Sequence, residues 1–159
     1  MLSLDRYDIE ILYHLQRDGR LTNADLAERI HLSPSQVNRR WRRLEQIGLI
    51  GRTAAILDAA KLGLGVTAFT DVSLERHSET RADAFHRAVM DMEEVLDCYS
   101  VTGESDYVLK IVTPDLQAFS EFLMHRLMHL PGVRSVHSRV VLTRVKEATA
   151  LPLGHLRRG

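Results

Sequence analysis

The run Ser33-Pro34-Ser35-Gln36 constrains the fold of this chain more than any other feature. Serine is a favoured N-cap, proline suits the first helical turn, and glutamine three residues after the serine completes a capping box. A helix is therefore predicted to begin here. An amphipathic segment already ends near His31-Leu32, so the turn between the two helices has only a few residues. Two helices joined by so tight a turn are typical of a helix-turn-helix.

The segments before this turn also carry helix signals. Asp5 can cap a first helix, which is predicted to end at Asp18-Gly19 because glycine adopts the left-handed cap conformation easily. Thr22 or Asn23 can cap the second helix. After the third helix, residues 49–58 have the character of a short extended ribbon. Three short helices followed by a ribbon predict a winged helix-turn-helix domain.

The third helix divides into an apolar stripe and a polar face. Its predicted buried stripe comprises Val37, Trp41, Leu44 and Ile47. In a helix-turn-helix, the N-terminal end of the second helix meets base edges in the major groove. The polar candidates for base readout are Ser35, Gln36, Asn38 and Arg39.

Basic residues on and after this helix are candidates for phosphate contacts, which set affinity and register. These candidates are Arg40, Arg42, Arg43 and Arg52. The alternative is a small helical domain with a solvated, arginine-rich face. The cap, the short turn and the polar face taken together favour double-stranded DNA as the partner. A formal net charge of +0 does not oppose this, since phosphates respond to local fields.

The hydrophobic period changes in the second half of the chain. Strands are predicted over residues 66–74, 95–102, 107–112 and 133–146, with helices over 80–92 and after Pro114-Asp115. The order β-α-β-β-α-β is the ferredoxin-like split motif. The predicted fold class is therefore α+β. Residues 1–60 form the helix-turn-helix domain with its wing, 61–65 a linker, and 66–159 a ferredoxin-like domain with a C-terminal tail.

Composition and the remaining polar residues exclude several classes. No apolar run approaches the roughly 20 residues of a membrane helix, and the single cysteine, Cys98, is predicted to serve packing in a cytosolic protein. His125 and His129 have the spacing of a zinc pair, with Glu121 one turn earlier, but the catalytic glutamate of the H-E-x-x-H pattern is absent. Two ordinary surface histidines are the favoured interpretation. No metal, cofactor or catalytic residue is predicted.

Taken together, the motifs closely resemble the Lrp/AsnC family, also called feast/famine regulators. In the first half the matching segments include Leu4-Asp5-Arg6, Asp18-Gly19-Arg20, Leu32-Ser33-Pro34-Ser35, Arg43-Leu44-Glu45, Gly48-Leu49-Ile50 and Lys61-Leu62-Gly63. In the second half they are Val101-Thr102-Gly103 with Asp106-Tyr107, Leu130-Pro131-Gly132-Val133 and Ala150-Leu151-Pro152-Leu153. The resemblance extends over nearly the whole chain.

The resemblance implies properties that the residues alone do not. The second domain would sense a small-molecule effector, usually an amino acid, and would form homodimers that often assemble further into octamers. The implied effector residues are Gly103, Glu104 and Asp106, with Met124, Ser135 and His137 as weaker candidates. Two departures concern function: Gly51-Arg52-Thr53 replaces the usual Gly-Tyr pair of the wing, and Glu104-Ser105 replaces an acidic-aromatic pair.

The sequence thus predicts a DNA-binding transcriptional regulator that is modulated by an amino acid through its assembly, and not an enzyme. One alternative is an enzyme similar to the haem-pathway decarboxylases that share this architecture. A second alternative is a sensor that binds no DNA. The arginines and the capping box of the third helix favour the regulator.

Overall fold

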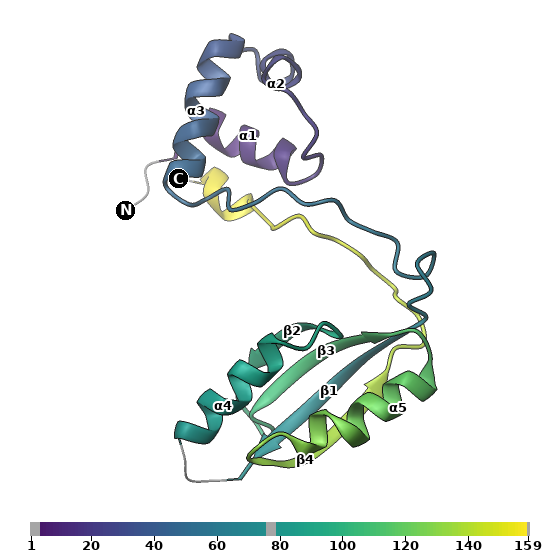
Figure 1. The fold of residues 1–159 in the computed structure, drawn as a ribbon. Coiled ribbons are helices and arrows are strands. Elements are labelled where there is room, and N and C mark those ends of the chain that lie inside the picture. The colour runs from purple at the N-terminus through teal and green to yellow at the C-terminus, as the bar shows by residue number, and fades with distance from the viewer. Residues whose placement is uncertain (1–3, 76–78, 159) are drawn as a thin grey trace. The chain divides into compact units, whose positions relative to one another are not determined.

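The computed structural model describes residues 4–75 and 79–158 and divides into two compact units. The first comprises Met1–Ile56 with Lys146–Gly159, and the second comprises Leu57–Val145. The predicted α+β class is confirmed: three helices come first, and a sheet covered by helices follows (Figure 1). The C-terminal tail, which the sequence analysis grouped with the second domain, clusters with the helical unit.

The helical unit contains α1 (Arg6–Leu15), α2 (Asn23–Ile30) and α3 (Pro34–Gln46), and the short 3-10 helix η2 (Gly154–Arg158) belongs to its tail. Each α-helix begins with a capping box, at Asp5, Thr22 and Ser33 respectively. The turn between α2 and α3 is only three residues long, and it holds His31 in the left-handed region at φ 56°.

The core of the helical unit is formed by the apolar faces of its three helices. Its fully buried side chains are Ile11, Leu26, Val37 and Leu44, each 0% exposed. Trp41 packs against this cluster and is half-buried, with its indole N–H donating to Glu45. Ile47, predicted for the buried stripe, is 44% exposed because it is the C-cap residue that follows the last helical turn.

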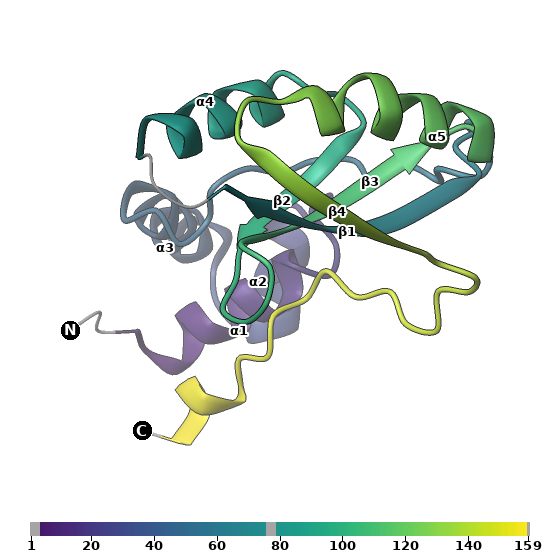
Figure 2. The ribbon, with the colours of Figure 1, turned by 90° about the horizontal axis from the view of Figure 1, so that it is seen from below.

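The second unit has a four-stranded antiparallel sheet in the order β2-β3-β1-β4. The strands are β1 (Val66–Leu74), β2 (Val95–Ser100), β3 (Tyr107–Thr113) and β4 (Val133–Val140). Two helices, α4 (Glu79–Met90) and α5 (Leu116–His125), cover one face, and the 3-10 turn η1 (Leu127–His129) follows α5 (Figure 2). The core between the layers is built on Phe85, Leu109, Ile111 and Leu127, all fully buried.

Two predictions about extended segments are wrong. The last strand ends at Val140 rather than at Lys146, because its partner β1 begins at Val66 and the backbone N–H of Val141 already bonds to the Thr67 carbonyl. Residues 49–58 contain no strand, although all of them are described. The stretch has no central turn that would let it pair with itself.

Candidate functional site

One face of α3 presents a line of exposed polar side chains, which we call the outer stripe. Its members are Ser35, Arg39, Arg42 and Gln46. They are spaced four, three and four residues apart, so they share one helical face opposite the buried Val37 and Leu44. Two of the four, Ser35 and Arg39, were predicted to read bases and Arg42 to contact phosphate. Gln46 was missed, although its helical spacing from Arg42 places it in the same line.

The other two predicted base readers, Gln36 and Asn38, are less available to DNA. The Gln36 side-chain oxygen accepts from both the backbone N–H and the hydroxyl of Ser33, each at 3.0 Å. Both lone pairs of this oxygen are therefore engaged in the helix cap. A bidentate contact of Gln36 with adenine, which needs the same oxygen as an acceptor, would have to break the capping box. Asn38 is half-buried on the flank of the helix.

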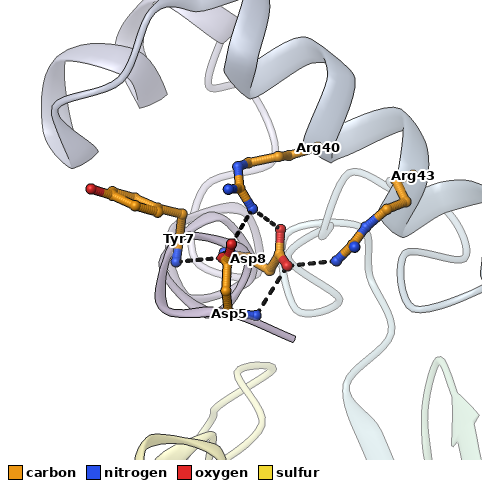
Figure 3. Close-up of polar contacts among 5 residues, drawn as sticks. All are labelled: Asp5, Tyr7, Asp8, Arg40 and Arg43. Atoms are coloured by element: carbon orange, nitrogen blue, oxygen red, sulfur yellow. Dashed lines mark hydrogen bonds and ion pairs between the residues drawn. The ribbon is translucent and has the colours of Figure 1, made fainter. Parts of the chain in front are cut away.

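Asp5, the N-cap of α1, and Asp8, in its first turn, hold the inner arginines of α3 (Figure 3). An Arg40 guanidinium nitrogen lies 2.7 Å from the Asp5 carboxylate and 2.8 Å from that of Asp8. The Arg43 guanidinium lies 2.6 Å from the second oxygen of Asp8. We call these four residues the acid clamp. Asp8 is only 1% exposed, so its charge is removed from water and is stabilised by the two guanidiniums.

Hydrogen bonds from the first turn of α1 fix the geometry of the acid clamp. The Asp5 carboxylate accepts from the backbone N–H of Tyr7 and of Asp8, and the Asp8 carboxylate accepts from the backbone N–H of Asp5. Burial raises the pKa of Asp5, but the Asp8 backbone N–H and the Arg40 guanidinium lower that pKa by more, so it lies below its ordinary value. The two carboxylates in turn raise the pKa of Arg40, against the effect of burial.

The acid clamp was not predicted from the sequence. The spacing Asp5-x-x-Asp8 is a capping-box pattern and could have marked Asp8 as a structured carboxylate. No local pattern shows that two arginines more than thirty positions away reach it.

Arg52, the last predicted phosphate contact, is exposed in the segment after α3. Beside it, Thr53 packs so closely on Gly19 that a Cβ at Gly19 would lie 2.8 Å from the threonine methyl.

The predicted effector hairpin lies at one end of the sheet. Gly103 adopts φ 125°, a conformation that side chains with a Cβ rarely take. Asp106 joins the hairpin to the end of β1: its carboxylate accepts from the Leu74 backbone N–H at 2.7 Å, and its own N–H donates to the Val72 carbonyl at 3.0 Å. Glu104 is exposed at the tip. Asp106 therefore has a structural role, and Glu104 offers the more accessible carboxylate.

The other predicted effector residues lie on two sides of the sheet. Ser135 pairs with Ser73 and His137 with Asp71 across the β1–β4 ladder. They alternate with Val136, which packs into the core, so their side chains lie on the face away from the helices. Met124 belongs to α5, in the helical layer. A single chain thus does not bring all six candidates together.

The metal and cysteine alternatives find no geometric support. Helix α5 ends at His125, so His129 does not follow it by one helical turn, and the described residues contain no group of three potential metal ligands. Cys98 was predicted to be a packing residue, but it is exposed on the edge strand β2. Partial burial of its thiol raises the pKa of Cys98, which disfavours the reactive thiolate. None of the described helices is both long enough and apolar enough to cross a membrane.

Family profiles match both units. A profile of a winged helix-turn-helix DNA-binding domain matches residues 4–50, and a profile of the Lrp/AsnC ligand binding domain matches residues 67–151. The leucine-responsive regulatory protein of Escherichia coli strain K12 is 38% identical over 149 residues, which are 94% of this chain and 91% of that protein. The Salmonella typhimurium protein of the same name gives the same values.

Solved structures give the same relationship. The L-Met complex of a transcriptional regulator from Neisseria meningitidis is similar with a TM-score of 0.94 and 42% identity, covering 97% of this chain and 99% of that one. An AsnC family transcriptional regulator from Agrobacterium tumefaciens has a TM-score of 0.91 and 35% identity, covering 96% of this chain and 99% of that one.

Proposed function

Because this chain belongs to the Lrp/AsnC family of DNA-binding transcription regulators, we propose that it reads its operators through the outer stripe of α3 and responds to an amino acid. The relatives that match over nearly their whole length are regulatory proteins. Regulation of transcription by DNA binding, with an amino-acid effector domain, therefore replaces the enzyme that was the first alternative.

We assign base readout to Ser35, Asn38 and Arg39. For Ser35 and Arg39, the observation that carries this assignment is the outer stripe itself, a line of exposed polar side chains on a helix whose opposite face is locked in the core. Asn38 lies half-buried on the flank of this stripe. Arginine pairs with guanine, and asparagine with adenine, through bidentate hydrogen bonds. Gln36 is the weakest of the predicted readers because its oxygen is held in the cap.

We assign phosphate contacts to Arg42 and Arg52, both exposed. Cationic side chains beside a recognition helix neutralise backbone phosphates and set the register of the helix on the duplex. The phosphate contacts predicted for Arg40 and Arg43 stay a prediction. The acid clamp gives these two guanidiniums carboxylate partners at the start of α1.

The proposed effector site is the hairpin end of the sheet. The neisserial relative that binds L-Met covers nearly all of this chain, which supports a free amino acid as the effector and makes methionine the first to test. We assign the ammonium group of the effector to Glu104, which is exposed at the hairpin tip, and its carboxylate to backbone N–H groups of the hairpin around Gly103. Ser135 and His137 lie on the sheet face and Met124 on the helical layer, so a complete site with all of them would need a second copy of the chain.

We further propose that the chain forms homodimers through the sheet face opposite the helices, and that dimers assemble into a higher homo-oligomer such as an octamer. Phe69 and Tyr99 are 39% and 58% exposed in a single chain and lie on that face. Apolar side chains of this size in an exposed sheet face favour burial against another surface. Effector binding would change operator affinity only if the amino acid binds one assembly state more tightly than the other.

The test is binding of the purified chain to DNA from upstream of its own gene, measured over a salt series with and without methionine. Specific, salt-sensitive binding that shifts with methionine supports the proposal. A Glu104→Gln variant should lose the methionine response and retain DNA binding, whereas Glu93→Gln, another exposed glutamate of the same unit, should keep both. An unchanged methionine response in Glu104→Gln would contradict the effector site.

A further inference from the structure

We propose that the acid clamp screens Arg40 and Arg43 from DNA, so that α3 presents two cationic side chains to the duplex rather than four. Asp8 is then a positioning residue that limits affinity for non-specific DNA. This inference rests on the proposed function, because it takes α3 as the recognition helix. Some arginines of α3 would then contact DNA, while others pair with carboxylates and stabilise the fold.

The geometry assigns the four arginines of α3 to two classes. Arg39 and Arg42 lie on the outer stripe, and within the described part of the chain neither forms an ion pair. Arg40 and Arg43 point toward α1, where their guanidiniums contact carboxylates at 2.6–2.8 Å (Figure 3). Arg40 also lies over the Tyr7 ring, 5.4 Å from its centroid.

Close pairing changes the field that these arginines exert. A guanidinium and a carboxylate in contact form a dipole, whose potential falls off faster with distance than that of a free charge. At physiological ionic strength salt screens the remainder over about 8 Å. The clamp contains two carboxylates for two guanidiniums, and Asp8, which contacts both, is buried. Arg40 and Arg43 therefore add little to the attraction of distant phosphates.

The consequence for non-specific affinity follows from counterion release. Each phosphate that a cation neutralises contributes about 0.9 to the slope of log K against log salt, for any DNA sequence. Four unscreened arginines would raise affinity for random DNA as much as for an operator. Screening two of them lowers both affinities by the same factor, so the ratio of specific to non-specific affinity is unchanged. Non-specific binding becomes weaker, and base readout by the outer stripe supplies a larger share of the total binding free energy.

The first experiment compares two neighbouring arginines on one helix. Binding of full-length Arg42→Gln and Arg43→Gln to a labelled random-sequence duplex is measured by fluorescence anisotropy over 50–250 mM KCl, a range within which roughly 10³- to 10⁵-fold changes occur for 6–10 contacts. We expect Arg42→Gln to lower the slope by about 0.9 per bound helix and Arg43→Gln to leave it unchanged. Equal loss of slope in both variants would overturn the proposal.

The second experiment removes the screen itself. Asp8→Asn keeps the shape of the side chain but removes its charge, and we expect tighter binding to random DNA with a slope steeper by about 0.9 per bound helix. Asp25→Asn is the matched control, since Asp25 occupies the same capping-box position in α2, and both variants change the net charge equally. A purely structural role of Asp8 would lower thermal stability and leave the slope like that of Asp25→Asn, which would also overturn the proposal.

These comparisons separate the screening from the proposed function. If Arg42→Gln does not alter the slope, the phosphate contact assigned above is wrong, while the difference between Asp8→Asn and Asp25→Asn still decides the screening. If circular dichroism shows that Asp8→Asn is unfolded, the comparison of Arg42→Gln with Arg43→Gln decides it. Screening is supported if the salt slope of Asp8→Asn for random DNA is steeper than that of Asp25→Asn. It is also supported if Arg43→Gln keeps the wild-type salt slope while Arg42→Gln has a lower one.

Discussion

Replacing Gln16 with alanine should release the C-terminal tail from the helical unit. Gln16 is the C-cap residue of α1, and its side-chain amide pairs with the backbone of Leu151 in both directions. The Leu151 N–H donates to the Gln16 oxygen at 2.8 Å, and the Gln16 nitrogen donates to the Leu151 carbonyl at 3.2 Å. This reciprocal pair resembles one rung of a β-ladder and connects positions 135 residues apart in the sequence.

The magnitude follows from these two hydrogen bonds. Each contributes about 0.5–1.5 kcal/mol net, and since both are exposed to solvent the lower half of that range applies. Their loss should therefore cost about 1–2 kcal/mol of local stability, which corresponds to a 5- to 30-fold shift toward the detached tail. The rest of the unit retains its core of Ile11, Leu26, Val37 and Leu44, so global unfolding should change little.

Amide hydrogen exchange measures this directly, because the Leu151 N–H is protected only while the tail is attached. In Gln16→Ala its exchange should accelerate by about 5- to 30-fold, while the amides of α3 keep their rates. Gln117→Ala is the matched control, as it removes a glutamine whose amide bonds to Glu121 within α5. An unchanged exchange rate of Leu151 in Gln16→Ala would refute the reasoning.

Three further predictions concern stability. Phe85→Ala removes a fully buried ring from the sheet unit and should cost about 3–5 kcal/mol, measured as a lower urea midpoint; a loss below 1 kcal/mol would contradict the core assignment. Gly103→Ala, at φ 125°, should cost about 1–2 kcal/mol in a thermal melt, and Gly51→Ala, in open space and without positive φ, should not. The pKa of Asp5 is lowered, so its contribution to the free energy of unfolding is complete above its ordinary pKa of 3.8 and is lost as the pH falls through the lower value. In Arg40→Gln, the stability measured by acid titration should therefore fall less over this pH range than in the wild-type chain.

Local signals in the sequence were sufficient for the helices and for most of the strands. The caps at Asp5 and Ser33 and the strand from Val66 to Leu74 lie where the pattern predicts them, because capping and alternation are properties of neighbouring residues. The final strand was predicted too long, since its end depends on where its partner strand begins. The β-rich character of residues 141–146 could not reveal this.

The candidate site also contains one part that the sequence predicts and one part that it does not. The outer stripe could be predicted because it follows the helical period around Val37 and Leu44. The acid clamp could not, because it depends on how α1 and α3 cross, which brings Asp8 to arginines 32 and 35 positions away. The helical period separates Arg39 and Arg42 from Arg40 and Arg43, but only tertiary contacts show that Arg40 and Arg43 pair with carboxylates at the start of α1.

Operator recognition depends most directly on Arg39, at the centre of the outer stripe. The decisive measurement is selection of bound fragments from a random DNA library by the wild-type chain and by Arg39→Ala, with the affinity of each for the enriched sequence. We predict that Arg39→Ala loses the preference at one base position and binds the sequence enriched by the wild-type chain about 1–3 kcal/mol more weakly. The same enriched sequence bound with the same affinity by both proteins would contradict the claim that this face of α3 reads DNA.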